Sequence, residues 1–335
     1  MKIAVDAMGG DYAPAEIVKG AVEAAALYDT DIILVGDEKA IKAHLPKRPE
    51  GLSRIEIHHT PDCISMEDCV NSVRTKPDAS VVVAAGMIRS GRAEAMISVG
   101  NTAAAMAVAA LKLGRIPGIE RPAIAAIVPC KGGNTILMDA GATADCTVNN
   151  LLQFAVMGSI YAEKVFKKPN PRIGLLSIGE ESTKGNELTK ATHPALAEAG
   201  LNFVGNVEGR DLFTGIADVI VADGFVGNVA LKVSEGLADF LLGNVKELSK
   251  NKLLLLPLLC IKPTMMKLKR QFDYSQYGGA PLLGVNGICI VGHGRSNARA
   301  VTNAIRAAKE AVDHDIINCI KTSLPGSEKC PAVGG

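Results

Sequence analysis

The chain has 335 residues, of which 48% are hydrophobic and 21% charged, and its formal net charge is +1. These proportions are those of a compact globular protein with a sizeable core. A charge this close to zero gives no electrostatic basis for nucleic-acid binding, so we expect no nucleic-acid partner. Trp is absent and aromatic residues make up only 4% of the chain, which removes the stacking surface that a single-strand binder needs.

The N-terminus and the cysteines favour a cytoplasmic protein. Met1–Asp6 leads directly into an apolar strand pattern, without the basic and apolar regions of a signal peptide. The eight cysteines include no C-x-x-C pair and no Cys/His spacing typical of zinc. We therefore expect reduced thiols, no metal site and no cofactor.

Short apolar strands alternate with longer, Ala-rich helices along the chain. Near-continuous apolar strands are typical of sheets that are covered on both faces. The alternation predicts an α/β fold, a three-layer α/β/α sandwich with a large, mostly parallel or mixed sheet. In chain order, the predicted strands are Ile3–Asp6, Asp31–Val35, Ala95–Val99, Thr135–Asp139, Arg172–Ile178, Val219–Asp223 and Gly287–Val291. The predicted helices are Glu16–Leu27, Thr102–Leu113, Val148–Phe166, Leu188–Ala199, Val229–Leu242 and Ala298–Asp313.

The domain organisation is predicted to be simple. No Ser/Pro/Gly-rich linker interrupts residues 1–322, so we expect a single α/β/α domain. Residues 251–273 differ in composition from the rest of the chain, because they are both apolar and basic, and we expect them to form an inserted hairpin. Residues 323–335 are predicted to be a mobile tail.

Six predicted strands end in turns that are rich in glycine and small polar residues. Glycine lets the backbone approach a ligand closely, and the helix that follows offers free N–H groups that suit phosphate. In open α/β sheets, ligands bind beyond the carboxyl ends of the strands. The turns are Asp6–Asp11, Ser98–Thr102, Asp139–Ala142, Gly179–Asn186, Asp223–Asn228 and Gly292–Asn297. The predicted phosphate-binding residues are Gly9, Gly10, Asn101, Thr102, Gly185, Asp223, Gly224, Gly227 and His293.

Two other interpretations of these turns stay open. Strand-to-helix turns need Gly, Asn and Asp for their own geometry and for helix capping, without any ligand. The sixth turn also begins like a dinucleotide fingerprint, but Asn297 stands where the third glycine belongs, so an NAD-dependent oxidoreductase is only a minor alternative. A complete P-loop is absent, which favours free phosphate over a nucleotide.

The turns belong to longer motifs, which are Val5–Asp11 with Pro14, Ser98–Thr102, Gly118–Pro122, Asp218–Glu235 and Tyr277–Gly284. Together they resemble the bacterial phosphate acyltransferase family PlsX, over residues 1 to about 320. The resemblance implies a fold similar to that of the phosphotransacetylases and the isocitrate and isopropylmalate dehydrogenases. It also implies transfer of a fatty acyl group from acyl carrier protein (ACP) to inorganic phosphate, which gives acyl phosphate for phospholipid synthesis. A homodimer in peripheral contact with the membrane is implied as well.

This reaction needs little help from a general acid or a general base. The thiol that leaves a thioester has a pKa of roughly 8.5, and phosphate is already anionic near neutral pH. The enzyme's main tasks are therefore positioning and charge stabilisation. The chain has no G-x-S-x-G elbow and no recognisable Cys–His pair, which favours direct attack of phosphate on the thioester.

Two residues are predicted to be catalytic. Lys184, in a turn flanked by glycines, is the candidate cation for phosphate, and the resemblance adds weight to it. The alternative is a solvated loop lysine. Asn228 is the candidate donor to the thioester oxygen, and its alternative is capping of the following helix. For Asp6, Asp139 and Asp223, which each end a strand, the functional alternative is to orient donors or hold a water, and the structural alternative is turn capping. For His293, a hydrogen bond to phosphate is weighed against an ordinary turn histidine.

The 251–273 segment is predicted to contact an anionic membrane. Its apolar run is interrupted by Pro257 and is shorter than the about 20 residues of a spanning helix, and lysines flank it. The predicted contact residues are Leu254, Leu255, Leu258 and Leu259. A dimer-packing arm is the alternative. For the whole protein, a phosphotransacetylase-like enzyme that uses acyl-CoA and a non-catalytic membrane-surface scaffold are the competing functions.

Overall fold

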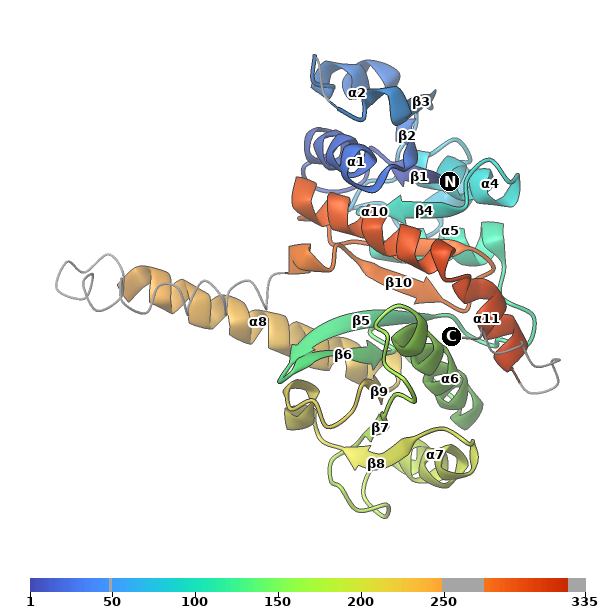
Figure 1. The fold of residues 1–335 in the computed structure, drawn as a ribbon, viewed down its shortest axis with the longest axis vertical. Helices are drawn as coiled ribbons and strands as arrows, with labels where there is room; N and C mark the ends of the chain where they lie inside the picture. The colour runs from blue at the N-terminus through green and yellow to red at the C-terminus, as the bar shows by residue number, and fades with distance from the viewer. Residues whose placement is uncertain (48–49, 249–273, 325–335) are drawn as a thin grey trace.

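The computed structural model describes residues 1–47, 50–248 and 274–324. Eleven strands of this part of the chain form one sheet, with helices on both faces (Figure 1). In sheet order the strands are β3 (Ile55–His59), β2 (Asp31–Gly36), β1 (Lys2–Asp6), β4 (Ala95–Ser98), β11 (Ile288–Val291), β10 (Ala280–Leu283), β5 (Ala123–Cys130), β6 (Gly133–Met138), β9 (Val219–Val221), β7 (Ile173–Leu176) and β8 (Phe203–Val207).

The helices of the described residues alternate with these strands along the chain. In chain order the α-helices are α1 (Ala15–Tyr28), α2 (Glu38–His44), α3 (Ser72–Thr75), α4 (Ser80–Arg89), α5 (Thr102–Val108), α6 (Val148–Lys164), α7 (Glu187–Glu198), α8 (Gly224–Leu248), α10 (Ala298–Asp313) and α11 (Ile316–Ser323). Short helical turns are η1 (Leu52–Arg54), η2 (Ala109–Leu113), η3 (Gly209–Phe213) and η4 (Tyr274–Gln276).

The sheet consists of two parallel halves that run in opposite directions. Strands β3, β2, β1, β4 and β11 are parallel to one another, and so are β6, β9, β7 and β8. Between the halves, β10 is antiparallel to both β11 and β5, and β5 is antiparallel to β6. The predicted α/β/α sandwich with a mixed sheet is confirmed.

The two strands that join the halves are outside the strands predicted from the sequence. β10 is only four residues long, and half of the eight residues of β5 are Ala or Pro, which have little intrinsic strand preference. Their extended form depends on pairing with distant segments, such as Leu282 with Ile124. The strand–helix alternation identifies the parallel halves except for β3 and β8, and it does not identify the antiparallel junction between them.

Apolar side chains fill the space on each face of the sheet. One cluster packs under α1, α6, α7, α10 and α11, and the other under α4, α5, η3 and α8. Alternate residues of one strand serve the two clusters, since side chains of a strand point to opposite faces. In β5, Ala123 and Ala125 belong to the first cluster, whereas Ile124, Ala126 and Val128 belong to the second.

Helix α8 extends away from the body of the molecule (Figure 1). A stripe of its apolar side chains is exposed, and we call this stripe the α8 stripe. Among the described residues, no helix combines the length and the apolar character that a membrane crossing requires. The stripe consists of Phe225, Val226, Val229, Val233, Leu237, Phe240 and Leu241.

Gly20 lets α1 pack closely against α10. A Cβ atom at this position would lie 2.4 Å from the carbonyl oxygen of Ala298 and 2.7 Å from Cβ of Val301. We expect Gly20→Ala to lower the free energy of unfolding by about 1–3 kcal/mol, because the two helices would have to move apart. Gly86 in α4 has no atom within 4 Å of such a Cβ, so Gly86→Ala should be neutral or stabilising by roughly 0.5–1 kcal/mol. Urea unfolding of both variants measures the difference, and equal stabilities would contradict this packing.

Candidate active site

The six glycine-rich turns form two groups, one for each half of the sheet. The turns after β1, β4 and β11 adjoin one another: the N–H of Asp11 donates to Gly294 O at 2.8 Å, and a Cβ on Gly9 would lie 3.0 Å from the nitrogen of Gly100. The turns after β6, β9 and β7 belong to the other half, where the N–H of Gly224 donates to Thr143 O at 2.8 Å. Because the halves run in opposite directions, the two groups leave the sheet at opposite ends of its strands.

A cleft of about 510 Å³ nevertheless reaches both groups. In β10, Ala280 pairs with Val291 at the end of β11, and Leu282 pairs with Ile124, next to the turn that follows β6. The two turn groups are therefore offset by only two residues of β10, about 7 Å along the strand. The short antiparallel strand brings the two groups of turns to the same cleft.

The cleft combines an apolar floor with a few polar side chains. Strand β5 forms the floor of the cleft. Helix α8 forms one wall, and α5 with the turn after β11 forms the other wall. The apolar lining includes Met106, Ile124, Ala126, Val128, Phe213 and Leu231, and the polar lining includes Thr102, Asn228, Lys232, His293 and Arg295. Such a composition is typical of sites for small molecules. A second cavity of about 550 Å³, near Tyr161 and Arg306, contains none of the predicted site residues.

Three of the predicted site residues line the cleft, namely Thr102, Asn228 and His293. The other predicted phosphate-binding and catalytic residues do not line the cleft; they are Gly9, Gly10, Asn101, Lys184, Gly185, Asp223, Gly224 and Gly227. The cleft therefore brings together one residue from the turn after β4, one from the start of α8 and one from the turn after β11. Lys232 is a lining residue that the sequence did not indicate, because an exposed cation has no distinctive pattern.

Asn228 lies inside α8 rather than before it. The helix begins at Gly224, five residues earlier than the predicted start at Val229, and Asp223 fills the capping position, where its Oδ1 accepts from the N–H of Val226 at 2.9 Å. The alternative that Asn228 caps the helix is thus wrong. Its side chain lies beside Gly141, where an added Cβ would be 3.4 Å from it. Its role as a donor stays a prediction.

Lys184 lies on the exposed loop after β7 and is not a lining residue of the cleft. Its backbone is fixed, since its N–H donates to Glu181 O at 3.0 Å and its carbonyl accepts from Ser177 Oγ at 3.3 Å. The neighbouring Gly185 has a φ of +112°, and a Cβ there would lie 2.0 Å from Thr189 Oγ1. The positive φ and the contact with Thr189 explain a glycine at this position without any ligand, and the catalytic role of Lys184 stays a prediction.

Two buried carboxyl groups hold the turns in place. Asp139 accepts hydrogen bonds from the backbone N–H groups of Ile124, Gly141, Ala142 and Thr143, at 2.7 to 3.2 Å. Asp6 accepts from the hydroxyls of Ser80 at 2.6 Å and Ser98 at 2.7 Å. Burial raises the pKa of both carboxyl groups, while these hydrogen bonds counteract the rise. For Asp139, these bonds stabilise the turn that follows β6.

Gly224 and Gly227 seat the start of α8 on the Asp139 turn. A Cβ on Gly224 would lie 2.6 Å from Asp139 Oδ2, and one on Gly227 would lie 1.9 Å from the carbonyl oxygen of Asp139. Both glycines are therefore required by packing. Because Asn228 follows directly, the position of its side chain depends on this contact.

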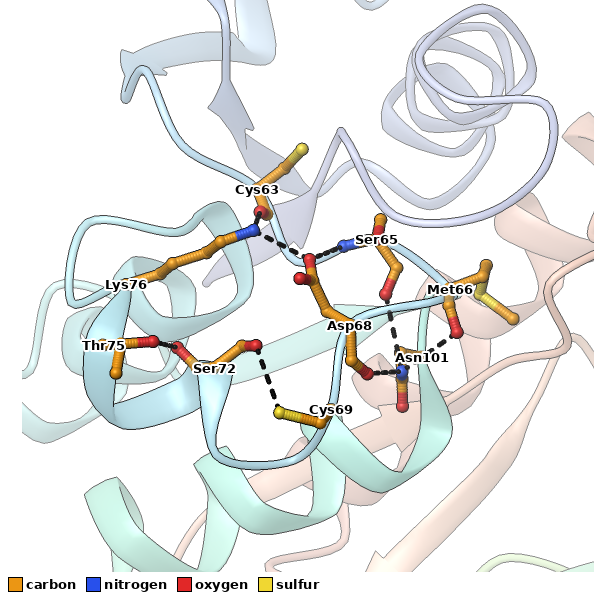
Figure 2. A network of polar contacts seen from close by, with 9 residues as sticks. All are labelled: Cys63, Ser65, Met66, Asp68, Cys69, Ser72, Thr75, Lys76 and Asn101. Atoms are coloured by element: carbon orange, nitrogen blue, oxygen red, sulfur yellow. Dashed lines mark hydrogen bonds and ion pairs between the residues drawn. The ribbon is translucent and has the colours of Figure 1, made fainter.

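The side chain of Asn101 fixes a distant loop to the start of α5 (Figure 2). Its Oδ1 caps the helix by accepting from the N–H of Ala104 at 3.0 Å, and its Nδ2 donates to three carbonyl groups between residues 65 and 68. Asp68 of that loop forms an ion pair of 2.8 Å with Lys76, which follows α3, and the hydrogen bond from Lys76 lowers the pKa of Asp68 to about 2. This network positions Thr102 in the cleft wall, and no sequence pattern indicates it.

His293 should titrate below its usual range. Partial burial, followed by the positive charge of Lys232, lowers the pKa of its imidazole, and its Nδ1 accepts from the N–H of Arg295 at 3.1 Å. Since the unfolded chain then binds the proton more readily, the free energy of unfolding should fall as the pH drops below about 6.5 and level off below the folded-state pKa. An NMR titration should give a pKa below 6.5, which Lys232→Gln raises. A value at or above 6.5 would contradict this environment.

Comparisons with known proteins agree with the fold and with the motifs. A family model described as "Fatty acid synthesis protein" matches residues 1–319. A phosphate acyltransferase of Pelotomaculum thermopropionicum is 53% identical over 330 residues, which cover 98% of this chain and 96% of that protein. One from Desulfitobacterium hafniense is 51% identical over 328 residues, covering 97% and 98%.

Solved structures that resemble the fold have low sequence identity. A phosphotransacetylase from Streptococcus pyogenes has a TM-score of 0.60 at 17% identity, covering 93% of this chain and 94% of its own. A branched-chain phosphotransacylase from Enterococcus faecalis has a TM-score of 0.57 at 15% identity, covering 93% and 99%. A 4-hydroxythreonine-4-phosphate dehydrogenase from Klebsiella pneumoniae, with a TM-score of 0.55 at 14% identity, covers 92% and 98%. The fold is thus the one that the sequence resemblance implies, and the chain belongs to the PlsX family of fatty acid synthesis proteins, the phosphate acyltransferases.

Proposed function

We propose that this protein transfers a fatty acyl group from ACP to inorganic phosphate and so supplies acyl phosphate for phospholipid synthesis. Membership of the phosphate acyltransferase family supports the reaction. The single observation that carries the proposal is the cleft, in which an apolar floor meets polar side chains from both halves of the sheet. The floor suits an acyl chain, and the polar groups suit phosphate and the thioester oxygen.

The proposed reaction is a direct displacement. A phosphate oxygen attacks the thioester carbonyl carbon, the new C–O bond forms as the C–S bond breaks, and the thiolate leaves and takes a proton from water. The amide of Asn228 donates to the carbonyl oxygen as negative charge develops on it. Thr102, His293 and the backbone of the glycine-rich turns hold phosphate, and Lys184 supplies a positive charge. Positioning accounts for most of the rate enhancement, because no strong base or acid is needed.

One assay separates the competing functions. The purified protein is mixed with acyl-ACP or with acyl-CoA, with and without inorganic phosphate, while free thiol and acyl phosphate are measured. We expect thiol release from acyl-ACP that depends on phosphate and matches the acyl phosphate formed. Preference for acyl-CoA would favour the phosphotransacetylase-like alternative. Equal release without phosphate would show a thioesterase, and no release with either donor would favour a scaffold.

A homodimer is also part of the proposal, with the α8 stripe as the contact. Its residues recur every three or four positions, Val233 and Leu237 are 64% and 56% exposed, and an apolar helix face of this kind needs a partner. We expect Val233→Glu with Leu237→Glu to convert a dimer into a folded monomer in light scattering. Leu27→Glu, at an exposed leucine of α1, is the control and should leave the dimer intact. A monomeric wild-type protein would contradict the proposed contact.

Peripheral association with an anionic membrane completes the proposal. Its predicted contact residues, Leu254, Leu255, Leu258 and Leu259, and the 251–273 hairpin are outside the described residues, as is most of the predicted tail. Support comes from the apolar and basic composition of the segment. Leu254→Glu with Leu258→Glu should reduce co-sedimentation with anionic liposomes, and unchanged binding would contradict the membrane contact.

A further inference from the structure

A third hollow, of about 680 Å³, adjoins the cleft. The turn after β6 separates the two: Ala140 and Gly141 line the cleft, whereas Ala142 and Thr143 line the hollow. Met106 of α5 lines both. A group bound in the hollow would therefore lie one turn away from Gly141, the residue against which Asn228 packs.

Segment 118–122, one of the family motifs, forms a wall of this hollow and has a firmly held backbone. The carbonyl of Gly118 accepts from Gln153 Nε2 at 2.8 Å, and the N–H of Glu120 donates to Gln153 Oε1 at 2.9 Å. The carbonyl of Glu120 accepts from Arg115 Nη1, and that of Pro122 accepts from Thr143 Oγ1 at 3.1 Å. The proposed transfer step does not use this motif.

The charged groups of the hollow are Arg115, Glu120 and Arg121. Both carboxylate oxygens of Glu120 point to α6, where they accept from the amides of Asn149 at 2.7 Å and Asn150 at 2.8 Å. The guanidinium of Arg121 makes no hydrogen bond or ion pair with another residue of the described part of the chain. The hollow thus presents two arginines, while its one carboxylate is engaged elsewhere.

We propose that Arg121, with Arg115, binds a phosphate group of a substrate in this hollow. A guanidinium on a rigid segment offers paired N–H donors that match the oxygens of phosphate. The inference rests on the proposed function, whose reaction has two sources of this chemistry. One is inorganic phosphate, and the other is the phosphodiester in the pantetheine arm of the acyl donor. If the phosphate of the phosphopantetheine arm binds in the hollow, the thioester at the other end of the arm can reach the cleft past the Asp139–Thr143 turn.

The test compares Arg121→Gln and Arg121→Lys with wild type. Arg89→Gln is the matched control, because Arg89 is also exposed, lines none of the three hollows and has no ion partner among the described residues. Binding of inorganic phosphate and of phosphopantetheine is measured by calorimetry, without turnover. The KM for phosphate and the KM for acyl-ACP are measured in the transfer assay, and thermal melting checks that each variant is folded.

We expect Arg121→Gln to weaken binding of one of the two phosphate compounds by roughly 10- to 100-fold, the usual loss for a hydrogen bond to a charged group. Arg121→Lys should recover part of this loss, and Arg89→Gln should match wild type. A higher KM for phosphate alone identifies the nucleophile as the ligand, and a higher KM for acyl-ACP alone identifies the arm. Wild-type affinities for both compounds in folded Arg121→Gln would overturn the site. A third outcome is that Arg121→Gln weakens phosphate binding while the wild-type protein shows no acyl transfer. This result would support the binding site and contradict the proposed reaction.

Discussion

Replacement of Asn228 by Ala should lower kcat by roughly 100-fold or more, the usual cost of removing one donor to a developing oxyanion. The side chain lines the cleft and is exposed, so its loss should leave the fold intact. KM for acyl-ACP should change less than kcat, because the thioester oxygen gains charge only during the reaction. Steady-state kinetics together with thermal melting measures both effects.

Two further variants of α8 sharpen this test. Asn228→Asp keeps the shape of the side chain but replaces the donor by a negative charge, so it should be at least as inactive as Asn228→Ala. Asn244→Ala removes an exposed asparagine farther along the same helix, whose Nδ2 donates to Phe240 O, and should leave kcat unchanged. Near-normal kcat in Asn228→Ala would remove this residue from the mechanism.

The same assay with Lys184→Ala decides whether the loop after β7 takes part. Lys184 is exposed and outside the cleft lining, so its substitution should not unfold the protein. A loss of turnover would mean that this loop approaches the cleft when substrate is bound. Unchanged kinetics in the folded variant would leave Lys184 as a solvated loop lysine, the alternative considered for it.

Replacement of Asp139 by Ala should lower the free energy of unfolding by about 3 kcal/mol or more. Four backbone N–H groups donate to this carboxyl group, and those that are buried would be left without an acceptor. Activity should fall as well, since Gly224 and Gly227 of α8 pack against Asp139. Urea unfolding gives the midpoint concentration and the slope of the free energy of unfolding against urea. A lower midpoint with an unchanged slope would show that the substitution lowers stability.

Matched variants separate this effect from loss of charge on the turn. Asp145→Ala removes an exposed carboxylate a few residues farther along and should change stability by less than about 0.5 kcal/mol. Asp139→Asn keeps one carbonyl oxygen as an acceptor and should lie between wild type and Asp139→Ala. If Asp139→Ala unfolded at the same urea concentration as Asp145→Ala, the carboxyl group would not hold the turn.

The sequence by itself determined the parts of this protein that depend on local chemistry. Apolar runs identified seven of the nine parallel strands of the described residues, and six of these seven end in the glycine-rich turns, because strand burial and turn geometry act over a few neighbouring residues. The same turns carried the resemblance that identified the family. Thr102, Asn228 and His293 were reached in this way, and all three line the cleft.

Only the tertiary structure decided how these parts meet. The antiparallel strands β10 and β5 have little strand signal of their own, yet their pairing sets the two-residue offset that brings both turn groups to one cleft. Asn228 proved to lie inside α8, because the helix is seated on the distant Asp139 turn through Gly224 and Gly227. Pairing and packing between segments far apart in the chain fixed these features, and the pattern of residues along one segment does not encode them.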